Sequence, residues 1–246
     1  MAGLSSTALS STAMVLAAGF GTRMRPLTLT KPKPLQSVGG KTMLDHALDR
    51  LVEAGIARAV INTHYLADQI AAHVKTRHDI DILISYEPEI LDTGGGIVRA
   101  LPHFDGKPFF ALNADLPWTD SDAPALARLR EAWNPEIMDA LLLMMPTRKA
   151  RGFLDKGDFN LGPEGHLARH GVLPPRSHVW IGVQILKPEL YENPAAPVFS
   201  NNLVWDSLEA RARLYGLEHH GSCYHVGTPE DLEKANALCE SGEGWG

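Results

Sequence analysis

Cysteine is scarce in this sequence, with Cys223 and Cys239 the two thiols in 246 residues. Two cysteines are too few for a disulfide framework and are typical of a protein in a reducing compartment. Long apolar runs are also missing, and none approaches the roughly 20 residues of a membrane-spanning helix. Residues 1–12 lack the basic and apolar segments of a secretory signal, so we expect a disordered leader there. These absences favour a cytoplasmic protein with no membrane partner.

Basic residues are few relative to acidic ones. The 23 lysines and arginines face 29 aspartates and glutamates, which gives a formal net charge of −6. A main partner made of nucleic acid would require a basic excess, so this class is disfavoured. The hydrophobic content of 44% and the charged content of 21% are ordinary for a globular protein. Because no linker, repeat or low-complexity segment is present, we expect a single domain over residues 13–246.

Short apolar runs alternate with segments of helical spacing in the first 146 residues. Strands are expected at 13–18, 57–62, 80–86, 109–112 and 139–145, and helices at 42–54, 66–74, 93–102 and 123–132. This alternation indicates an α/β fold with a doubly wound, mostly parallel, Rossmann-like sheet flanked by helices. Beyond residue 146 the rhythm changes, with strands expected at 151–161 and 179–186 and helices at 202–213 and 229–240. We expect this half to form a second lobe, 147–246, beside the first, 13–146.

A glycine loop follows the first expected strand. Residues 16–28 read Leu-Ala-Ala-Gly-Phe-Gly-Thr-Arg-Met-Arg-Pro-Leu-Thr, and Pro-Lys-Pro-Leu follows at 32–35. Glycines let the backbone turn its N–H groups toward phosphate oxygens, and nearby cations balance the remaining charge. The pattern suits a triphosphate, with Arg23, Arg25 and Lys33 as the nearby cations.

Two better-known phosphate loops do not fit this stretch. The dinucleotide fingerprint requires glycine at position 24, where Met24 stands. The end of a Walker loop is present as Gly40-Lys41-Thr42, but its first glycine would fall on Leu35. The remaining alternative is a plain strand-to-helix turn at Gly19 and Gly21, which has no use for three nearby cations.

Three motifs fall at the carboxyl ends of expected strands, where parallel sheets bind ligands. The glycine loop is the first, Thr93-Gly94-Gly95-Gly96 the second and Asn113-Ala114-Asp115 the third. Asp115 suits Mg²⁺, which prefers carboxylate oxygens, although an aspartate here can also cap a turn. The glycine triplet lets a flat base lie against bare backbone, and its alternative is a flexible loop that opens a helix.

These motifs together resemble those of sugar-1-phosphate nucleotidyltransferases, over essentially residues 13 to 240. Such enzymes join a nucleoside triphosphate to a sugar 1-phosphate and release pyrophosphate. The resemblance implies a fold of the nucleotidyltransferase A type, with Arg23, Lys33 and Asp115 as catalytic residues. It implies that Lys33 contacts the reacting phosphates and Arg23 the leaving pyrophosphate. The sugar phosphate oxygen would attack the α-phosphorus in line, with no covalent enzyme intermediate.

The resemblance also assigns a binding role to each lobe. It makes residues 13–146 the nucleotide-binding lobe and residues 147–246 the sugar-binding lobe. The implied nucleotide contacts are Leu16, Ala17, Ala18, Gly19, Gly21, Thr22, Arg23, Asn62, Thr93, Gly94, Gly95 and Asn113. The implied sugar contacts are Lys156, Asp158, Asn160 and Gly182.

One position departs from the family pattern. The second metal ligand of the family is usually an Asp or Asn just ahead of Val-Gly-Thr-Pro, and here His225 precedes that element. Imidazole is a poor ligand for Mg²⁺ and a better one for softer ions such as Mn²⁺. His225 therefore coordinates directly, contacts a metal-bound water or phosphate, or leaves the ion to Asp115 alone, and we favour the second arrangement. Mg²⁺ is the expected cofactor, with Mn²⁺ as the alternative, and Thr228-Pro229-Glu230 alternatively serves only as a helix start.

Within the family, the chain most resembles the N-acetylmuramate-1-phosphate uridylyltransferases of peptidoglycan recycling. Its compact length and the segments 92–97, 113–120 and 156–159 carry this likeness. It implies that UTP and N-acetylmuramate 1-phosphate react to UDP-N-acetylmuramate, in a monomer or homodimer. The alternatives are a guanylyltransferase for mannose 1-phosphate or a related hexose or heptose 1-phosphate, and a non-catalytic nucleotide-sensing subunit. His225 alone supports the sensor, and the catalytic residues named above oppose it.

Overall fold

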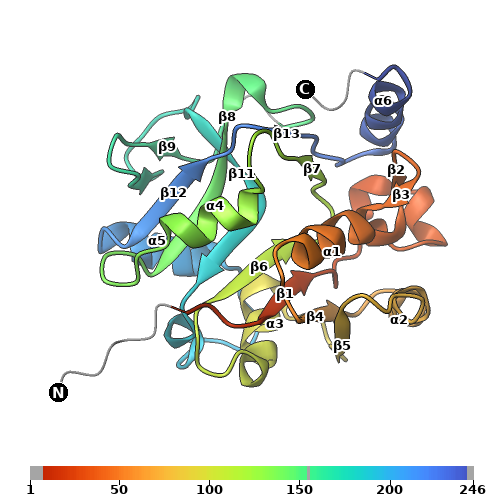
Figure 1. Cartoon of the computed structure of the whole chain (residues 1–246), viewed down its shortest axis with the longest axis horizontal. Helices are drawn as coiled ribbons and strands as arrows, with labels where there is room; N and C mark the ends of the chain where they lie inside the picture. The colour runs from red at the N-terminus through yellow and green to blue at the C-terminus, as the bar shows by residue number, and fades with distance from the viewer. Residues whose placement is uncertain (1–7, 154–155, 243–246) are drawn as a thin grey trace.

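The computed structural model describes residues 8–153 and 156–242, and a seven-stranded sheet runs through its centre in the order β12-β8-β11-β6-β1-β4-β5 (Figure 1). The strands are β1 (Thr12–Leu16), β4 (Arg58–Thr63), β5 (Asp81–Tyr86), β6 (Phe109–Asn113), β8 (Ala140–Pro146), β11 (His178–Leu186) and β12 (Leu214–Glu218). The pairs β1–β4, β1–β6, β4–β5 and β8–β12 are parallel, and β11 runs antiparallel to both β6 and β8. The expected α/β fold with a mostly parallel sheet is confirmed.

Helices cover both faces of the sheet (Figure 1). On one face lie α1 (Met43–Glu53), α2 (Ala67–Val74) and α4 (Ala125–Ala132), and on the other lie α3 (Asp92–Ala100) and α5 (Asn202–Ala210). Successive residues of β1 alternate between the two cores, with Val15 in the first and Met14 in the second. Because both faces are covered, the strands read as continuous apolar runs.

A third, smaller core lies beside the glycine loop. Here α6 (Pro229–Glu240) packs its Ala235 against Met24 and Val38. The helix begins with a capping box, in which the Thr228 hydroxyl accepts from the Asp231 N–H and the Asp231 carboxylate accepts from the Thr228 N–H. The expected helix start at Thr228-Pro229 is confirmed, and it fixes the segment that carries His225.

Short elements complete the chain. Two-stranded pairs are formed by β2 (Ser37–Val38) with β3 (Lys41–Thr42), β7 (Trp118–Thr119) with β13 (Ser222–Cys223), and β9 (Asn160–Leu161) with β10 (Leu167–Ala168). The 3₁₀ helices are η1 (Thr22–Met24), η2 (Leu27–Leu29), η3 (Lys33–Leu35), η4 (Leu101–His103), η5 (Thr147–Lys149) and η6 (Pro188–Tyr191). Among the described residues, no helix combines the length and the apolar character needed to cross a membrane.

Two expectations for the second half of the chain are wrong. The expected strand over 151–161 is reduced to β9, because Gly152 and Gly157 have φ values of +73° and +62° and turn the chain. The helix expected over 202–213 ends at Ala210, and the strand β12 that follows it was not expected. Residues 154–155 lie outside the described part of the chain.

The start of the chain also differs from expectation at one boundary. Strand β1 begins at Thr12 rather than Ala13, and the Ser10 N–H donates to the Pro108 carbonyl at 2.7 Å. Residues 1–7 of the expected leader lie outside the described residues.

Candidate active site

Three adjoining cavities lie at the carboxyl ends of β1, β4 and β6. The loop cavity, of about 240 Å³, is lined by Leu16, Ala17, Gly19, Gly21, Thr22, Arg23, Met24, Lys33, Pro34, Asp115 and Gly227. The central cavity, of about 390 Å³, is lined by Leu16, Ala18, Gly19, Asn62, Glu87, Ile90, Asp92, Thr93, Asn113, Asp115 and Val198. The lobe cavity, of about 510 Å³, is lined by Leu16, Asp92, Thr93, Asp158, Phe159, Arg169, His170, Arg176, Trp180, Gln184, Ser200, Asn201, Asn202 and Trp205. Leu16 lines all three, and the central cavity also shares Asp115 with the loop cavity and Thr93 with the lobe cavity, so the three lie side by side and are together called the cleft.

The two glycines of the loop have different reasons to be glycine. Gly21 has φ +60°, and a Cβ there would lie 3.0 Å from side-chain atoms of both Lys33 and Thr28. A Cβ at Gly19 would meet nothing within 4 Å, although this residue lines both the loop and the central cavity. The protein's own packing therefore explains Gly21, whereas Gly19 leaves the backbone bare toward the cleft. This is what a ligand that approaches the backbone requires.

Backbone donors of the loop face no protein acceptor. Within the described residues, the backbone N–H groups of residues 18–21 form no hydrogen bond. Further along the loop, the Met24 N–H donates to the Gly21 carbonyl at 2.9 Å. Successive free N–H groups on a turning backbone form an anion-binding concavity. The loop can therefore receive phosphate oxygens without breaking a bond of its own.

Glu87, a residue that sequence reasoning missed, holds the loop in place through Asn62. Glu87 is fully buried, and its Oε1 accepts from Asn62 Nδ2 at 2.7 Å while its Oε2 accepts from the Leu91 N–H at 3.0 Å. The Asn62 Oδ1 in turn accepts from the Ala17 N–H at 2.8 Å. Glu87 directly follows β5, so the rule that selected Asp115 after β6 could have found it.

Lys33 and Asp115 form an ion pair in the cleft. The Lys33 Nζ donates to the Asp115 Oδ2 at 2.6 Å, and their side chains are 10% and 31% exposed. Burial opposes the charge on Asp115, but the Lys33 ammonium outweighs it and holds the pKa of that carboxyl below its ordinary value. Strand β6 positions Asp115 and η3 positions Lys33, so two elements distant in sequence place opposite charges together.

Arg23 also lines the loop cavity, at the side nearest the C-terminal segment. A Cβ built on Gly227 would lie 3.5 Å from the Arg23 Nη1, an ordinary van der Waals distance, so the guanidinium lies beside this segment. Arg25 is exposed and is not among the residues that line the three cavities. The structure thus brings Arg23, Lys33 and Asp115 to one cavity and leaves Arg25 outside it.

His225 reaches this region because β13 pairs with β7. Its N–H donates to the Arg151 carbonyl at 2.9 Å, and its ring Nδ1 lies 3.0 Å from the Gly152 carbonyl. A carbonyl only accepts, so Nδ1 carries the proton and Nε2 is left with a lone pair. Burial and the charges of Lys33 and Arg23 lower the pKa of His225, which keeps the ring neutral at pH 7.

Asp115 and His225 supply groups that suit a divalent cation, although His225 is not among the residues that line the three cavities. Asp115 offers carboxylate oxygens, and a histidine that donates one ring N–H to a backbone carbonyl has the orientation typical of a metal-binding histidine. In the described residues a group of three ligand-type side chains lies elsewhere, at His170, Asp206 and Glu209. Arg169 pairs with Asp206 there, and none of the three side chains lies beside the glycine loop or Asp115.

The glycine triplet does not present bare backbone to the cleft. Gly94, Gly95 and Gly96 are buried in α3, where a Cβ on Gly94 would overlap the Phe199 ring and one on Gly95 the Pro197 carbonyl. Gly94 and Gly95 therefore make room for the chain's own segment 197–199, and Gly96 for the side chains of Asn62 and Glu87. Thr93, just before them, lines both the central and the lobe cavity.

Of the four expected sugar contacts, Asp158 alone is among the residues that line the lobe cavity. Its Oδ2 accepts from the Trp180 N–H at 2.9 Å, and burial raises the pKa of its carboxyl. The other three have roles in the backbone. The Lys156 carbonyl accepts from the Arg176 N–H, and the Asn160 Oδ1 accepts from the Ser177 N–H. Gly182 has a φ of +78°, which favours glycine. Sequence reasoning missed the polar and aromatic lining at Arg169, Arg176, Trp180, Gln184, Asn201 and Trp205.

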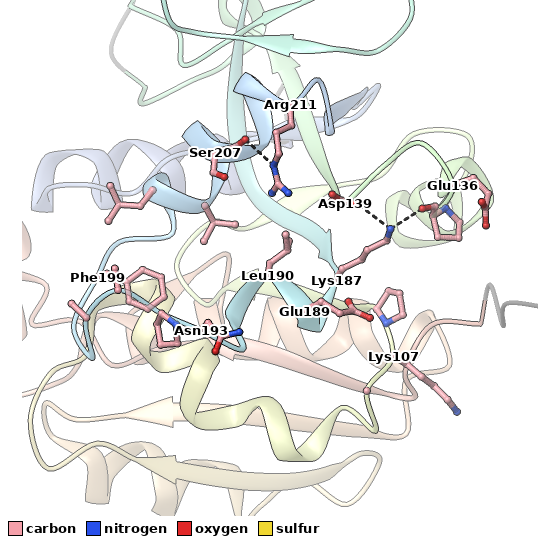
Figure 2. A pocket seen from close by; sticks show the side chains of 18 residues that line it. Lys107, Glu136, Asp139, Lys187, Glu189, Leu190, Asn193, Phe199, Ser207 and Arg211 are labelled. Carbon is pink, nitrogen blue, oxygen red and sulfur yellow. Dashed lines mark hydrogen bonds and ion pairs between the residues drawn. The ribbon is translucent and has the colours of Figure 1, made fainter.

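A larger cavity, of about 1040 Å³, lies away from these motifs (Figure 2). It contains none of the expected site residues, and Figure 2 shows its central cation, Lys187, turned toward Asp139. The Lys187 Nζ donates to the Asp139 Oδ1 at 2.8 Å and to the Pro135 carbonyl at 2.7 Å. The Lys187 ammonium is therefore already paired within the protein. The volume of a cavity alone does not identify the active site.

The chain is similar to known proteins in sequence and in fold. Residues 12–153 match the nucleotidyl transferase family. The chain is 42% identical over 233 residues to the N-acetylmuramate alpha-1-phosphate uridylyltransferase of Caulobacter vibrioides, which covers 92% of this chain and 95% of that protein. It is 35% identical over 236 residues to the protein of the same name from Neisseria meningitidis serogroup B, covering 92% and 97%. The crystal structure of UDP-glucose pyrophosphorylase complexed with UDP-glucose has a TM-score of 0.74 at 17% identity, over 94% of this chain and 98% of that one.

The structural likeness at this low identity shows the fold, and the sequence likeness shows the family. Members of the family transfer a nucleotidyl group from a nucleoside triphosphate to a sugar 1-phosphate, usually with a divalent metal ion. A sequence match along nearly the whole chain, with the glycine loop and Asp115 meeting at one sheet edge, shows that this chain belongs to the nucleotidyl transferase family, as a sugar-1-phosphate nucleotidyltransferase.

Proposed function

We propose that the protein transfers the uridylyl group of UTP to N-acetylmuramate 1-phosphate, giving UDP-N-acetylmuramate and pyrophosphate. One observation carries the proposal: the Lys33–Asp115 pair lies where the loop cavity meets the central cavity, and the lobe cavity opens beyond Leu16. The cleft thus has a charged centre with space for a triphosphate, a nucleoside and a sugar. The two uridylyltransferase relatives support the choice of base and sugar.

Each cavity receives one part of the substrates. The free N–H groups of the glycine loop and Arg23 bind the β- and γ-phosphates in the loop cavity. The nucleoside lies in the central cavity beside Asn62, Thr93 and Asn113. The sugar occupies the lobe cavity, where Asp158 accepts from a hydroxyl group.

The chain's part in the reaction is positioning and charge neutralisation. Nucleotidyl transfer needs the attacking and leaving oxygens in line, and it needs little covalent help from the protein. Lys33 stabilises the negative charge that develops at the α-phosphate, and Arg23 stabilises the departing pyrophosphate. Asp115 fixes the Lys33 ammonium in the cleft before the substrates arrive.

Mg²⁺ is the proposed cofactor, with Mn²⁺ as a substitute. When bound, a divalent ion neutralises phosphate oxygens and orients them. Asp115 would hold the ion directly, and His225 would accept a hydrogen bond at Nε2 from a water on the ion. A neutral ring with its proton on Nδ1 has no N–H group left to donate to a phosphate. We therefore propose that His225 acts as a hydrogen-bond acceptor or as a metal ligand through Nε2.

The two lobes divide these roles. We propose residues 13–146 as the nucleotide lobe and 147–246 as the sugar lobe, within a cytoplasmic monomer or homodimer. The lining of the lobe cavity supports this division, since most of it comes from the second lobe, although Leu16, Asp92 and Thr93 come from the first.

The test is a reaction of the purified protein with UTP, N-acetylmuramate 1-phosphate and Mg²⁺. We expect pyrophosphate and UDP-N-acetylmuramate in equal amounts, measured by a coupled phosphate assay and by mass spectrometry. With a chiral α-thio-UTP, direct in-line attack predicts inversion at phosphorus. Pyrophosphate release without a sugar nucleotide, or retention of configuration, would contradict the proposal.

A further inference from the structure

Arg176 is a cation of the lobe cavity whose guanidinium is only partly used by the protein. Its Nη2 donates to the Arg169 carbonyl at 2.9 Å. Its Nε is buried and has no hydrogen-bond partner among the described residues. Within residues 8–153 and 156–242, no acidic side chain forms an ion pair with it. Because Nε is shielded from solvent, it does not face the cavity; the Arg176 Nη1, which has no hydrogen bond among the described residues, is the donor left for a ligand that supplies an acceptor.

Arg169, the other arginine of this cavity, is fully engaged. Its Nε and Nη2 donate to the Asp206 carboxylate, and its Nη1 donates to the Asn202 Oδ1 at 2.8 Å. Its guanidinium also lies over the rings of Phe159 and Trp205, at 5.4 Å and 5.8 Å from their centres. Arg169 is therefore part of the cavity wall, and Arg176 is the arginine left to bind a substrate.

The remaining lining suits a sugar that carries an apolar substituent. The Trp180 and Trp205 rings meet edge to face with their centres 4.7 Å apart. Both indole N–H groups are already used, on the Val183 carbonyl and the Gln184 Oε1, so the rings offer carbon surface. Asp158 in the same cavity is an acceptor for a hydroxyl group. The cavity thus combines apolar walls, a hydroxyl acceptor and a planar cationic donor.

N-acetylmuramate differs from N-acetylglucosamine by a lactyl ether on O3, which ends in a carboxylate. Guanidinium groups match carboxylates with two parallel hydrogen bonds. The sugar phosphate lies at the Lys33–Asp115 centre, which Arg176 does not line, so the lactyl carboxylate is the anion within its reach. We propose that Arg176 binds the lactyl carboxylate and thereby selects N-acetylmuramate 1-phosphate, an inference that rests on the proposed function.

A thermodynamic cycle, in which the lactyl carboxylate of the substrate and the Arg176 guanidinium are removed separately and together, tests this assignment. The probes are N-acetylmuramate 1-phosphate and its lactyl amide, compared by kcat/KM at saturating UTP in wild type and Arg176→Met. In wild type we expect the amide to be about 10- to 100-fold worse, the range of a charge-assisted hydrogen bond. In Arg176→Met the acid should fall to the level of the amide, and the amide should change little, because the contact is already lost.

Two further variants serve as controls for this cycle. Arg148→Met removes an exposed arginine of η5 that does not line the cleft, and it should keep the full preference for the acid. Arg176→Lys keeps the charge without the fork and should keep part of the preference, which also serves if Arg176→Met does not fold.

An equal loss on both substrates would assign Arg176 to structure or to the phosphate, and an unchanged preference in Arg176→Met would remove it from recognition. Equal use of acid and amide by the wild type would also overturn the inference. In each of these cases UDP-N-acetylmuramate formation by the wild type leaves the proposed function standing. Absence of that product would overturn both.

Discussion

Lys33 is the residue on which the charge balance of the cleft depends. Its ammonium neutralises Asp115 in the free protein and faces the reacting phosphates in the proposed complex. Removing it with Lys33→Met should lower kcat by about 10²- to 10³-fold, because preorganised charge stabilises the transition state more than the bound substrate. The measurement is steady-state kinetics with UTP and N-acetylmuramate 1-phosphate.

The exposed Lys31, two residues earlier, provides the matched control. Lys31→Met should keep nearly wild-type kcat, because only its carbonyl has a described contact, with Gln36 Nε2. Equal losses in both variants would show that general positive charge, and not the position of Lys33, supports the reaction.

His225 gives a second prediction at the residue scale. If it reaches the ion through water, His225→Ala should leave the ratio of activity with Mn²⁺ to activity with Mg²⁺ unchanged, since the variant adds no ligand and the directly bound atoms stay the same. The check is kcat/KM for UTP with each metal in both proteins. A shift of preference from Mn²⁺ toward Mg²⁺ in the variant would show that His225 binds the ion directly.

At the scale of elements, Asp139 connects the ends of three strands. It precedes β8 and accepts from Lys187, which follows β11, at 2.8 Å and from Arg213, which precedes β12, at 2.9 Å. Burial opposes its charge, but Arg213 and Lys187 outweigh burial and lower its pKa below the ordinary 3.8. The ion pairs of Asp139 with Lys187 and Arg213 therefore stabilise the fold fully at neutral pH. This stabilisation is lost as the pH falls through the folded-state pKa of Asp139.

Asp139→Asn should lower the free energy of unfolding by about 1–3 kcal/mol at pH 7, the range for a charged hydrogen-bonded group. At pH 3, below the ordinary pKa of 3.8, the difference from wild type should shrink, because the carboxyl of the unfolded chain is then mostly protonated and must lose its proton to form the ion pairs. Urea unfolding at both pH values measures this, with the exposed Asp122→Asn as the control. A difference of the same size at both pH values would contradict the assignment of the effect to charge.

Elements with local signals were predictable from the sequence, and elements that depend on distant contacts were not. Helices α1 and α6 have apolar spacing, caps and end residues that are visible in the chain itself. Strand β12 has none of these, because it is defined by pairing with β8 some 70 residues earlier along the chain. The antiparallel direction of β11 likewise follows from the sheet as a whole.

The residues of the site likewise fall into those that the sequence predicts and those that it does not. Asp115 and the glycine loop follow apolar strands, so strand order places them at one edge. The cover that segment 197–199 forms over Gly94 is invisible in the sequence, because a glycine needed for packing and one needed for a ligand read alike. Arg176 and Trp180 come from irregular segments with no periodicity, and only the folded chain shows that they share a cavity.

At the scale of the whole molecule, residues from both halves of the chain line the same cleft. Leu16 and Thr93 come from the first half, and Asp158 and Trp205 from the second, yet all four line the lobe cavity. In the proposed complex, nucleotide and sugar sites that share Leu16 and Thr93 bring the sugar phosphate close to the α-phosphorus. Choice of base and choice of sugar are then properties of one continuous surface.

A single competition reaction tests this claim most directly. The protein is given UTP, GTP, CTP, ATP and dTTP together with the 1-phosphates of N-acetylmuramate, N-acetylglucosamine and mannose, and the initial sugar nucleotides are counted by mass spectrometry. Initial product ratios report ratios of kcat/KM for competing substrates. The account predicts that UDP-N-acetylmuramate dominates. Predominance of GDP-mannose, or nucleotide binding with no sugar nucleotide formed, would contradict it.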